Sequence, residues 1–222
     1  MQTILSNKVV RNNHNNMNHK EVNTEQVILE AAEAEFLEKG YGNAKTVAIA
    51  RRAGVSHSML HYYYRTKEQL FQRIFKEKVQ ALSKMFSMVF EQQVDFTGTL
   101  RLLIQTQFRF VAQNQQLPLF IFREILVSEE NRAWAIETLF PHLFPFLSTI
   151  EKMLSIEVSK GAVRPITMQD LLMNIISINI SVFIAMPILK ENLHFDNDEM
   201  MENFLEERCE SNVQFILNAL RP

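Results

Sequence analysis

Apolar side chains recur every three to four residues along most of this chain, which is the spacing that places them on one face of an α-helix. The pattern predicts helices over residues 24–39, 47–53, 57–63, 67–90, 97–112, 118–127, 131–159, 168–190 and 199–220. Pro141 and Pro145 should kink the segment 131–159 or split it in two. No segment alternates with the two-residue period of a strand beside a hairpin signal, so we predict an all-α fold.

Two of the predicted helices are short and are separated by a tight turn. Thr46 is placed to cap the first helix, and Ser56 is placed to cap the second. Between them, Gly54 allows the positive φ angle that a sharp turn requires. Two short helices joined in this way form a helix-turn-helix. The segment 67–90, about 35 Å long at 1.5 Å per residue, predicts a helix that joins an N-terminal three-helix bundle to a larger helical C-terminal domain.

The helix-turn-helix coincides with a concentration of positive charge. The 222-residue chain has a net charge of -2, yet residues 45–67 contain five Lys or Arg, two His, three consecutive Tyr and no Asp or Glu. A cationic surface on an otherwise acidic protein indicates that a polyanion docks there. Arg51 and Arg52 could face that polyanion or could pair with Glu30 or Glu33, and both interpretations stay open.

Other function classes find no support in the sequence. No nucleophile elbow, P-loop, HExxH, CxxC or dinucleotide fingerprint is present, so we expect neither an enzyme nor a cofactor. His57 and His61 have metal-ligand spacing, but no carboxylate or cysteine lies nearby in sequence, so we expect no metal. The apolar run 171–189 contains Asn, Ser and Pro, which favours a buried helix over a membrane span. A single cysteine favours the cytoplasm. The polar, Asn-rich residues 1–20 predict a disordered arm.

Two stretches, ILEAAEAEFLEKGY and TVAIARRAGVSHSMLHYYYRTKEQL, resemble the N-terminal domain of the TetR (tetracycline repressor-like) transcriptional regulators. The resemblance covers about residues 23–75, and the rest of the chain resembles the family only in its all-helical plan. The matching positions are Ile28, Ala31, Ala32, Phe36, Gly40, Tyr41, Thr46, Val47, Ile49, Ala50, Ala53, Gly54, Val55, Ser56, Leu60, Tyr62, Lys67, Glu68 and Leu70. The resemblance implies a helix-turn-helix DNA-binding domain at 21–75 and an effector-binding and dimerisation domain at 76–222.

The chain also departs from the family pattern in the second helix of the motif, which the resemblance places in the major groove as His57 to Tyr63. His57 and Ser58 stand where the family often has Lys, Arg or Pro followed by Gly, so no known operator sequence can be transferred. We predict that His57, Ser58 and Met59 contact base edges. Tyr62 and Tyr63 suit phosphates, although a tyrosine packing cluster is the alternative. The predicted DNA-binding residues are Lys45, Thr46, Ser56, His57, Ser58, Met59, His61, Tyr62, Tyr63 and Lys67.

One short helix reads too few base pairs to select a genomic site, so we predict a homodimer that binds an inverted repeat in double-stranded DNA. The last two long helices are the candidates for the dimer contact, because residues 171–188 are apolar nearly all round. Val213, Phe215, Ile216 and Leu220 could join that interface. A core formed within one chain is the alternative explanation for the same residues.

The resemblance further implies a pocket for an effector in the C-terminal domain. The candidate lining residues are Phe86, Phe90, Phe108, Phe120, Arg123, Glu124, His142, Phe144, Met173 and Asn174. Their mostly apolar character favours a small hydrophobic effector. The sequence therefore predicts a ligand-responsive transcriptional repressor that the effector releases from its operator. A dimeric DNA-binding protein without a small-molecule effector is the alternative.

Overall fold

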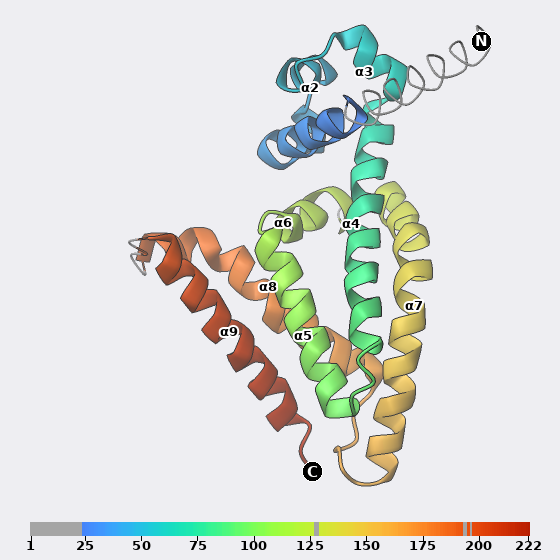
Figure 1. Cartoon of the computed structure of the whole chain (residues 1–222), viewed down its shortest axis with the longest axis vertical. Helices are drawn as coiled ribbons and strands as arrows, with labels where there is room; N and C mark the ends of the chain where they lie inside the picture. Colours follow the sequence, from blue (N-terminus) through green and yellow to red (C-terminus); the bar gives the residue numbers. More distant parts are fainter. Residues whose placement is uncertain (1–23, 127–128, 193–194, 196) are drawn as a thin grey trace, which may run out of the picture. The chain divides into compact units, whose positions relative to one another are not determined.

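The computed structural model describes residues 24–126, 129–192, 195 and 197–222, and all of these that form regular structure are helical. The predicted N-terminal arm lies outside the described residues. After a helical segment at 24–43, the elements run in the order shown in Figure 1. They are α2 (Thr46–Arg52), α3 (His57–Tyr63), α4 (Lys67–Phe90), α5 (Phe96–Gln113), α6 (Leu117–Ile121), the π-helix η1 (Phe122–Leu126), α7 (Glu129–Ser159), α8 (Met168–Asn192) and α9 (Asp198–Ala219). The predicted all-α fold is confirmed for this part of the chain.

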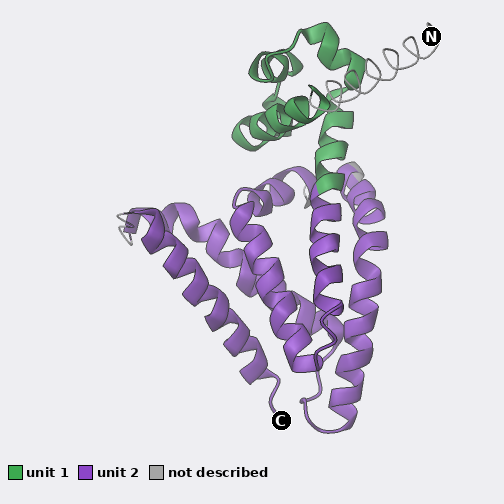
Figure 2. Cartoon of the chain, viewed as in Figure 1, with its two compact units in different colours: residues 1–77 green, residues 78–222 purple. Residues whose placement is uncertain are grey.

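The helices form two compact units, residues 1–77 and 78–222, and α4 runs through the boundary between them (Figure 2). Compared with the predicted domain division, this boundary lies two residues further along the chain. In the first unit, Ile28, Phe36 and Ile49 are fully or almost fully buried, and α3 and α4 contribute Leu60 and Leu70, which are both fully buried. These side chains hold α2 and α3 against the two longer helices.

Local sequence signals set most helix ends. Ser56 accepts a hydrogen bond from the backbone N–H three residues later, which confirms its predicted capping role, and Thr167 and Asn197 do the same at the starts of α8 and α9. Gly54 follows α2 with a positive φ of 67°. Gly40 also has a positive φ, at 79°, but the helical segment continues through it to residue 43, so the predicted helix end at residue 39 is wrong. The predicted cap of α2 is wrong, because α2 begins at Thr46 itself and Lys45 precedes it without a side-chain cap.

Two predicted segments differ from the structure. The expected helix at 118–127 is instead α6 followed by the π-helix η1. Of the two outcomes predicted for the segment with Pro141 and Pro145, the split is wrong, since α7 continues through both prolines, and the kink stays a prediction.

In the second unit, α5 packs against α7, α8 and α9 (Figure 1). Its core includes Val213, Ile216 and Leu220 from the end of the chain, so these residues serve the interior of one chain and their predicted place in a dimer contact is wrong.

A buried amide network joins α5, α8 and α9 inside this unit. Asn179 and Asn212 are 0% and 1% exposed. Asn212 Nδ2 donates to Asn179 Oδ1 at 3.0 Å, and Asn179 Nδ2 donates to the Ile104 carbonyl at 3.0 Å and to Gln107 Oε1 at 2.5 Å. Among the described residues, no buried side-chain nitrogen or oxygen is left without a hydrogen-bond partner, as buried polar groups require.

Candidate nucleic-acid interface

Helix α3 has one anchored face and one exposed face. Leu60 is fully buried, and Tyr64, which caps the C-terminal end of the helix, is 7% exposed. The Tyr64 hydroxyl donates to the Glu25 carboxylate at 2.8 Å, and burial together with this bond raises the pKa of the phenol. With these two residues fixed in the core, the opposite face of α3 must point to solvent.

That exposed face carries the residues predicted to read bases. His57, Ser58 and Met59 are all exposed at the start of α3, and Met59 is 45% accessible. The Ser56 hydroxyl accepts from the Met59 backbone N–H at 3.1 Å and lies 2.9 Å from the Ser58 hydroxyl. The helix start is thus a row of polar groups and one flexible apolar side chain, which is the mixture that can contact both base edges and a thymine methyl.

The two histidines of α3 pack against each other and reach α2. Their rings meet edge to face with centroids 4.4 Å apart, and His57 Nε2 lies 3.1 Å from the Thr46 hydroxyl. Within the described residues, no group of three His, Cys, Asp or Glu is arranged to hold a metal ion.

The tyrosines divide as their positions along α3 require. Tyr62 is 77% exposed and Tyr63 is half-buried, and their rings meet edge to face at 5.4 Å. The exposed hydroxyl of Tyr62 is therefore accessible to a partner.

Lys67 has a different environment from the one that the sequence predicts. Its ammonium donates to the carbonyls of Tyr41, Gly42 and Ala44 at 2.7, 3.2 and 3.1 Å, and it lies 4.6 Å from the centre of the Tyr41 ring. Because an ammonium has three protons, these carbonyls take all of them. In this structure the Lys67 ammonium therefore holds the backbone of residues 41–44. Its predicted contact with DNA stays a prediction.

The two arginines of α2 also separate in role. Arg52 pairs with Glu38 at 2.6 Å, and a weaker contact reaches Glu35 at 4.0 Å, so its partners differ from the predicted Glu30 and Glu33. Hydrogen bonds from Lys39 and then from Arg52 lower the pKa of Glu38 to about 2. Arg51 is exposed beside this network.

The site occupies the part of the chain that a known family shares. Residues 28–74 match the family model for bacterial regulatory proteins of the tetR family, a segment that contains α2 and α3 and ends in α4. The segment that forms this site therefore belongs to the TetR family. The resemblance predicted from the sequence is thereby confirmed.

Two named bacterial proteins are similar to part of this chain. The nucleoid occlusion factor SlmA of Vibrio cholerae is 26% identical over 116 residues, which are 51% of this chain and 59% of that protein. The fatty acid metabolism regulator protein of Bacillus subtilis is 23% identical over 137 residues, which are 62% of this chain and 69% of the relative. This chain therefore matches less than two thirds of the length of SlmA.

Solved structures extend the likeness to the whole fold. A tetR-family regulatory protein from Rhodococcus RHA1 has a TM-score of 0.69 at 18% identity, covering 89% of this chain and 97% of that one. FadR from Bacillus subtilis, in complex with stearoyl-CoA, has a TM-score of 0.65 at 18% identity, covering 88% of this chain and 99% of that one. At these identities the comparison establishes a shared architecture.

Beyond the segment that matches the TetR family, the second unit has a small apolar cavity of about 80 Å³ among α4, α5, α7 and α8. Its lining residues are Phe86, Leu100, Leu103, Gln107, Phe146, Leu147, Ile150, Met168, Leu171, Leu172, Ile175 and Ile176. Of the pocket residues predicted from sequence, Phe86 lines this cavity, and Phe90 stacks on Phe146 beside it with ring centroids 5.4 Å apart.

The other predicted pocket residues lie elsewhere. Phe144, Met173 and Asn174 are exposed, and Arg123 pairs with its neighbour Glu124 at 2.8 Å. Phe120 is buried, and His142 is half-buried. None of these seven residues lines the cavity.

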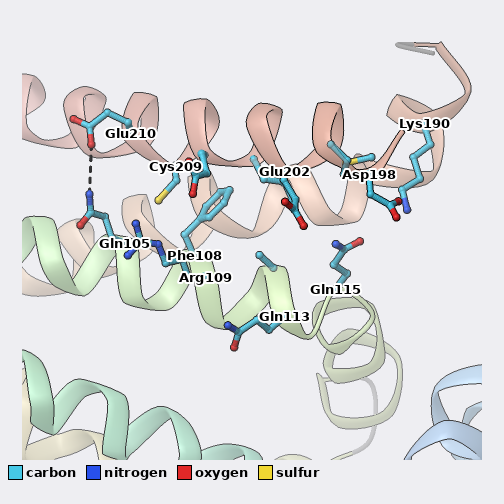
Figure 3. Close-up of a pocket in the computed structure, with 14 residues that line it drawn as sticks. Gln105, Phe108, Arg109, Gln113, Gln115, Lys190, Asp198, Glu202, Cys209 and Glu210 are labelled. Atoms are coloured by element: carbon cyan, nitrogen blue, oxygen red, sulfur yellow. Dashed lines mark hydrogen bonds between the residues drawn. The ribbon is translucent and has the colours of Figure 1, made fainter. Parts of the chain in front are cut away.

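Phe108 instead lines a larger open groove of about 750 Å³, which sequence reasoning did not predict. Figure 3 shows it between α5 and α9, with Gln105 donating to Glu210 at 3.4 Å. Cys209 lies in its wall, where burial raises the pKa of the thiol. The four-residue spacing of acidic side chains along α9 is the sequence signal that could have indicated this wall.

Proposed function

We propose that this protein is a cytoplasmic transcription regulator that binds an operator as a homodimer through α3 and is released by a small hydrophobic effector. The observation that carries the DNA-binding role is the polarity of α3. Leu60 and Tyr64 fix one face in the core, while His57, Ser58 and Met59 remain exposed at the N-terminal end of the helix. That end is the part of a recognition helix that meets base edges in the major groove.

The proposed contacts fall into two classes. His57, Ser58 and Met59 read base edges, with His61 one turn further along the helix. Lys45, Thr46, Ser56, Tyr62 and Tyr63 bind phosphates, which position the helix without specifying sequence. Lys67 acts indirectly, because its hydrogen bonds to the backbone of residues 41–44 hold the segment that leads into Lys45 and Thr46.

The dimer contact is proposed on α8 and α9. Helix α8 is long and apolar enough to cross a membrane by length and composition, since its most apolar 18 residues have a mean hydropathy of 2.1. Only 28% of that stretch is buried within the chain, so much of its apolar surface is exposed. Met173, Ile184 and Ile188 are exposed on α8, and Phe215 is exposed on α9. In a family of DNA-binding regulators, a second copy of the chain is a better cover for this surface than a bilayer.

The effector is proposed to enter the 80 Å³ cavity of the second unit. Ligand pockets usually measure about 300–1,000 Å³, so an acyl chain could enter only if the lining helices moved apart. Phe86 lines the cavity on α4, and the same helix carries the buried Leu70 of the first unit. A ligand that widens the cavity would therefore displace a helix on which the DNA-binding unit is built. The required differential affinity is about 1–3 kcal/mol.

The test of the DNA-binding role is selection of bound fragments from the source genome, followed by titration of the selected duplex and of a random duplex. At about 150 mM salt, selective binding supports a regulator, with log affinity falling by about 0.9 per neutralised phosphate for each unit of log salt. Equal binding of both duplexes would refute sequence-specific regulation.

The effector is tested separately, by adding stearoyl-CoA and shorter acyl-CoA esters to the preformed complex. Release of the duplex supports the proposed regulation. If no acyl-CoA ester changes the affinity, acyl-CoA esters are excluded as the effector, and the alternative of a regulator without an effector gains support. The choice of probe follows from the stearoyl-CoA bound to the structurally similar FadR.

A further inference from the structure

Where α2 contacts α3, a hydrogen bond between Thr46 and His57 can determine which nitrogen of His57 carries the proton. His57 is exposed on α3, but its Nε2 atom lies 3.1 Å from the hydroxyl of Thr46, eleven residues earlier in the chain. The hydroxyl has one proton to donate, and neutral imidazole has one N–H. Whichever group donates in this hydrogen bond decides which proton His57 offers at its other nitrogen, Nδ1.

We propose that Thr46 is a positioning residue that sets the base preference of His57, a role that rests on the proposed DNA-binding function. Thr46 is the first residue of α2 and is one of the residues that the proposed function assigns to phosphates. A phosphate oxygen is a stronger acceptor than a neutral imidazole nitrogen, because charge-assisted hydrogen bonds are about twice as strong as neutral ones.

The bound phosphate therefore takes the Thr46 proton, and the hydroxyl oxygen is left to accept from His57 Nε2–H. The Nδ1 atom of His57 then carries a lone pair and no proton. In the major groove, an acceptor at this position pairs with the amino group of adenine N6 or cytosine N4, and does not pair with the acceptors of guanine or thymine. A phosphate contact at Thr46, which has no sequence information of its own, thus determines what His57 reads.

Neighbouring residues make His57 the group through which this control acts. The Ser58 hydroxyl lies 2.9 Å from the hydroxyl of Ser56, the N-cap of the same helix, so its hydrogen-bond partner is a neighbour in the sequence. Met59 has no polar group at its tip. The edge-to-face contact with His61 at 4.4 Å restricts the tilt of the His57 ring, so that the Thr46 contact is held in one orientation.

Two substitutions separate this role from ordinary phosphate binding. Thr46→Val removes the hydroxyl and keeps the shape of the side chain, whereas Thr46→Ser keeps the hydroxyl. Each full-length variant is titrated against the selected operator duplex and against duplexes changed at single base pairs. Thr46→Val should lower discrimination at one position of each half-site by about threefold to tenfold, and Thr46→Ser should retain it.

A spectroscopic measurement gives an independent readout of the same hydrogen bond. Long-range proton–nitrogen correlation of the histidine rings, assigned with a His57→Gln variant, reports the tautomer of His57. In the wild-type complex the proton should reside on Nε2, and Thr46→Val should shift the ring toward a mixture. Thermal unfolding of each variant verifies that the fold is retained.

The outcomes separate the two proposals. If the wild-type protein discriminates among duplexes but Thr46→Val weakens all of them by one factor, Thr46 is a phosphate contact alone and the inference is wrong. A proton on Nδ1 of His57 in the wild-type complex also overturns it. If the wild-type protein discriminates among no duplexes, the proposed function itself fails.

Discussion

Substitution of Lys67 by methionine should destabilise the first unit, because the Lys67 side chain bonds the start of α4 to the backbone of residues 41–44. Methionine keeps an unbranched apolar stem but cannot donate to the carbonyls of Tyr41, Gly42 and Ala44. Hydrogen bonds to charged groups contribute about 1.5–3 kcal/mol each, and are not additive when they share one donor group. The contact with the Tyr41 ring adds about 0.5–1 kcal/mol. After allowance for water that can reach the partly exposed carbonyls, we expect a loss of about 2–3 kcal/mol.

The distribution of aromatic residues allows each unit to be followed separately. All four tyrosines lie in the first unit, at positions 41 and 62–64, whereas the single tryptophan, Trp134, lies in the second. Urea unfolding monitored by tyrosine second-derivative absorbance should shift in the Lys67→Met variant, while the Trp134 fluorescence transition should shift little. Lys76→Met is the matched control, since it removes an exposed lysine from the same helix and should change stability by less than about 0.5 kcal/mol.

A second control tests geometry as well as charge. Lys67→Arg retains the positive charge, but a planar guanidinium does not match three carbonyls that converge on one point, so its stability should be intermediate. The reasoning is refuted if Lys67→Met unfolds like Lys76→Met. If it also lowers DNA affinity and the salt slope falls by about one phosphate, Lys67 is a phosphate ligand and its bonds to the backbone of residues 41–44 are unimportant.

Three further predictions concern the second unit. Ile184→Glu on α8 should convert a dimer to monomers in analytical ultracentrifugation. Ile136→Glu on α7 is the control and should stay dimeric, since this isoleucine has the same 53% exposure. If both variants are dimeric, α8 is excluded from the interface. Asn212→Leu should cost about 1–3 kcal/mol by leaving Asn179 Oδ1 without its buried donor, and the exposed Asn218→Leu is its control in Trp134-monitored unfolding. A hydrogen bond from Arg101 lowers the pKa of Glu210, so this pair stabilises the fold above the ordinary glutamate value of 4.5 and the contribution is lost as pH falls below it. Because both side chains are about a third or more exposed, the effect should be at most about 1 kcal/mol, and Arg101→Met should remove that part of the acid dependence of the unfolding temperature.

Local features of this fold could be predicted from the sequence because their causes are local. The caps at Ser56, Thr167 and Asn197 each involve a side chain and a backbone group three residues apart, so the residue pattern contains the whole interaction. The core face of α3 follows in the same way from the spacing of Leu60 and Tyr64.

Features that depend on distant segments could not be predicted. Thr46 looks like a helix cap in sequence, but its hydroxyl meets His57 only after α2 and α3 have packed. The carbonyls that surround Lys67 come from residues 23–26 positions earlier in the chain. No pattern near Lys67 in the sequence records their approach.

The predicted pocket shows why helical periodicity alone could not identify the cavity-lining residues. Helical periodicity identifies an apolar face but does not state what covers it, so exposed Phe144 and Met173 could not be distinguished from the cavity-lining Phe86. Similarly, Val213 and Phe215 are close neighbours on α9, yet one is fully buried and the other is exposed. The tertiary packing of α9 on α5 and α8 decides between them.

The amide contacts of Asn179 and Asn212 also constrain how this interior can vary. A slip of α9 by one residue along α8 would take the Asn212 donor away from Asn179 Oδ1 and leave that buried oxygen without it, whereas apolar side chains could exchange neighbours at little cost. The pair therefore fixes the register of α9 against α8. In descendants of this protein, either asparagine should be replaced only together with its counterpart.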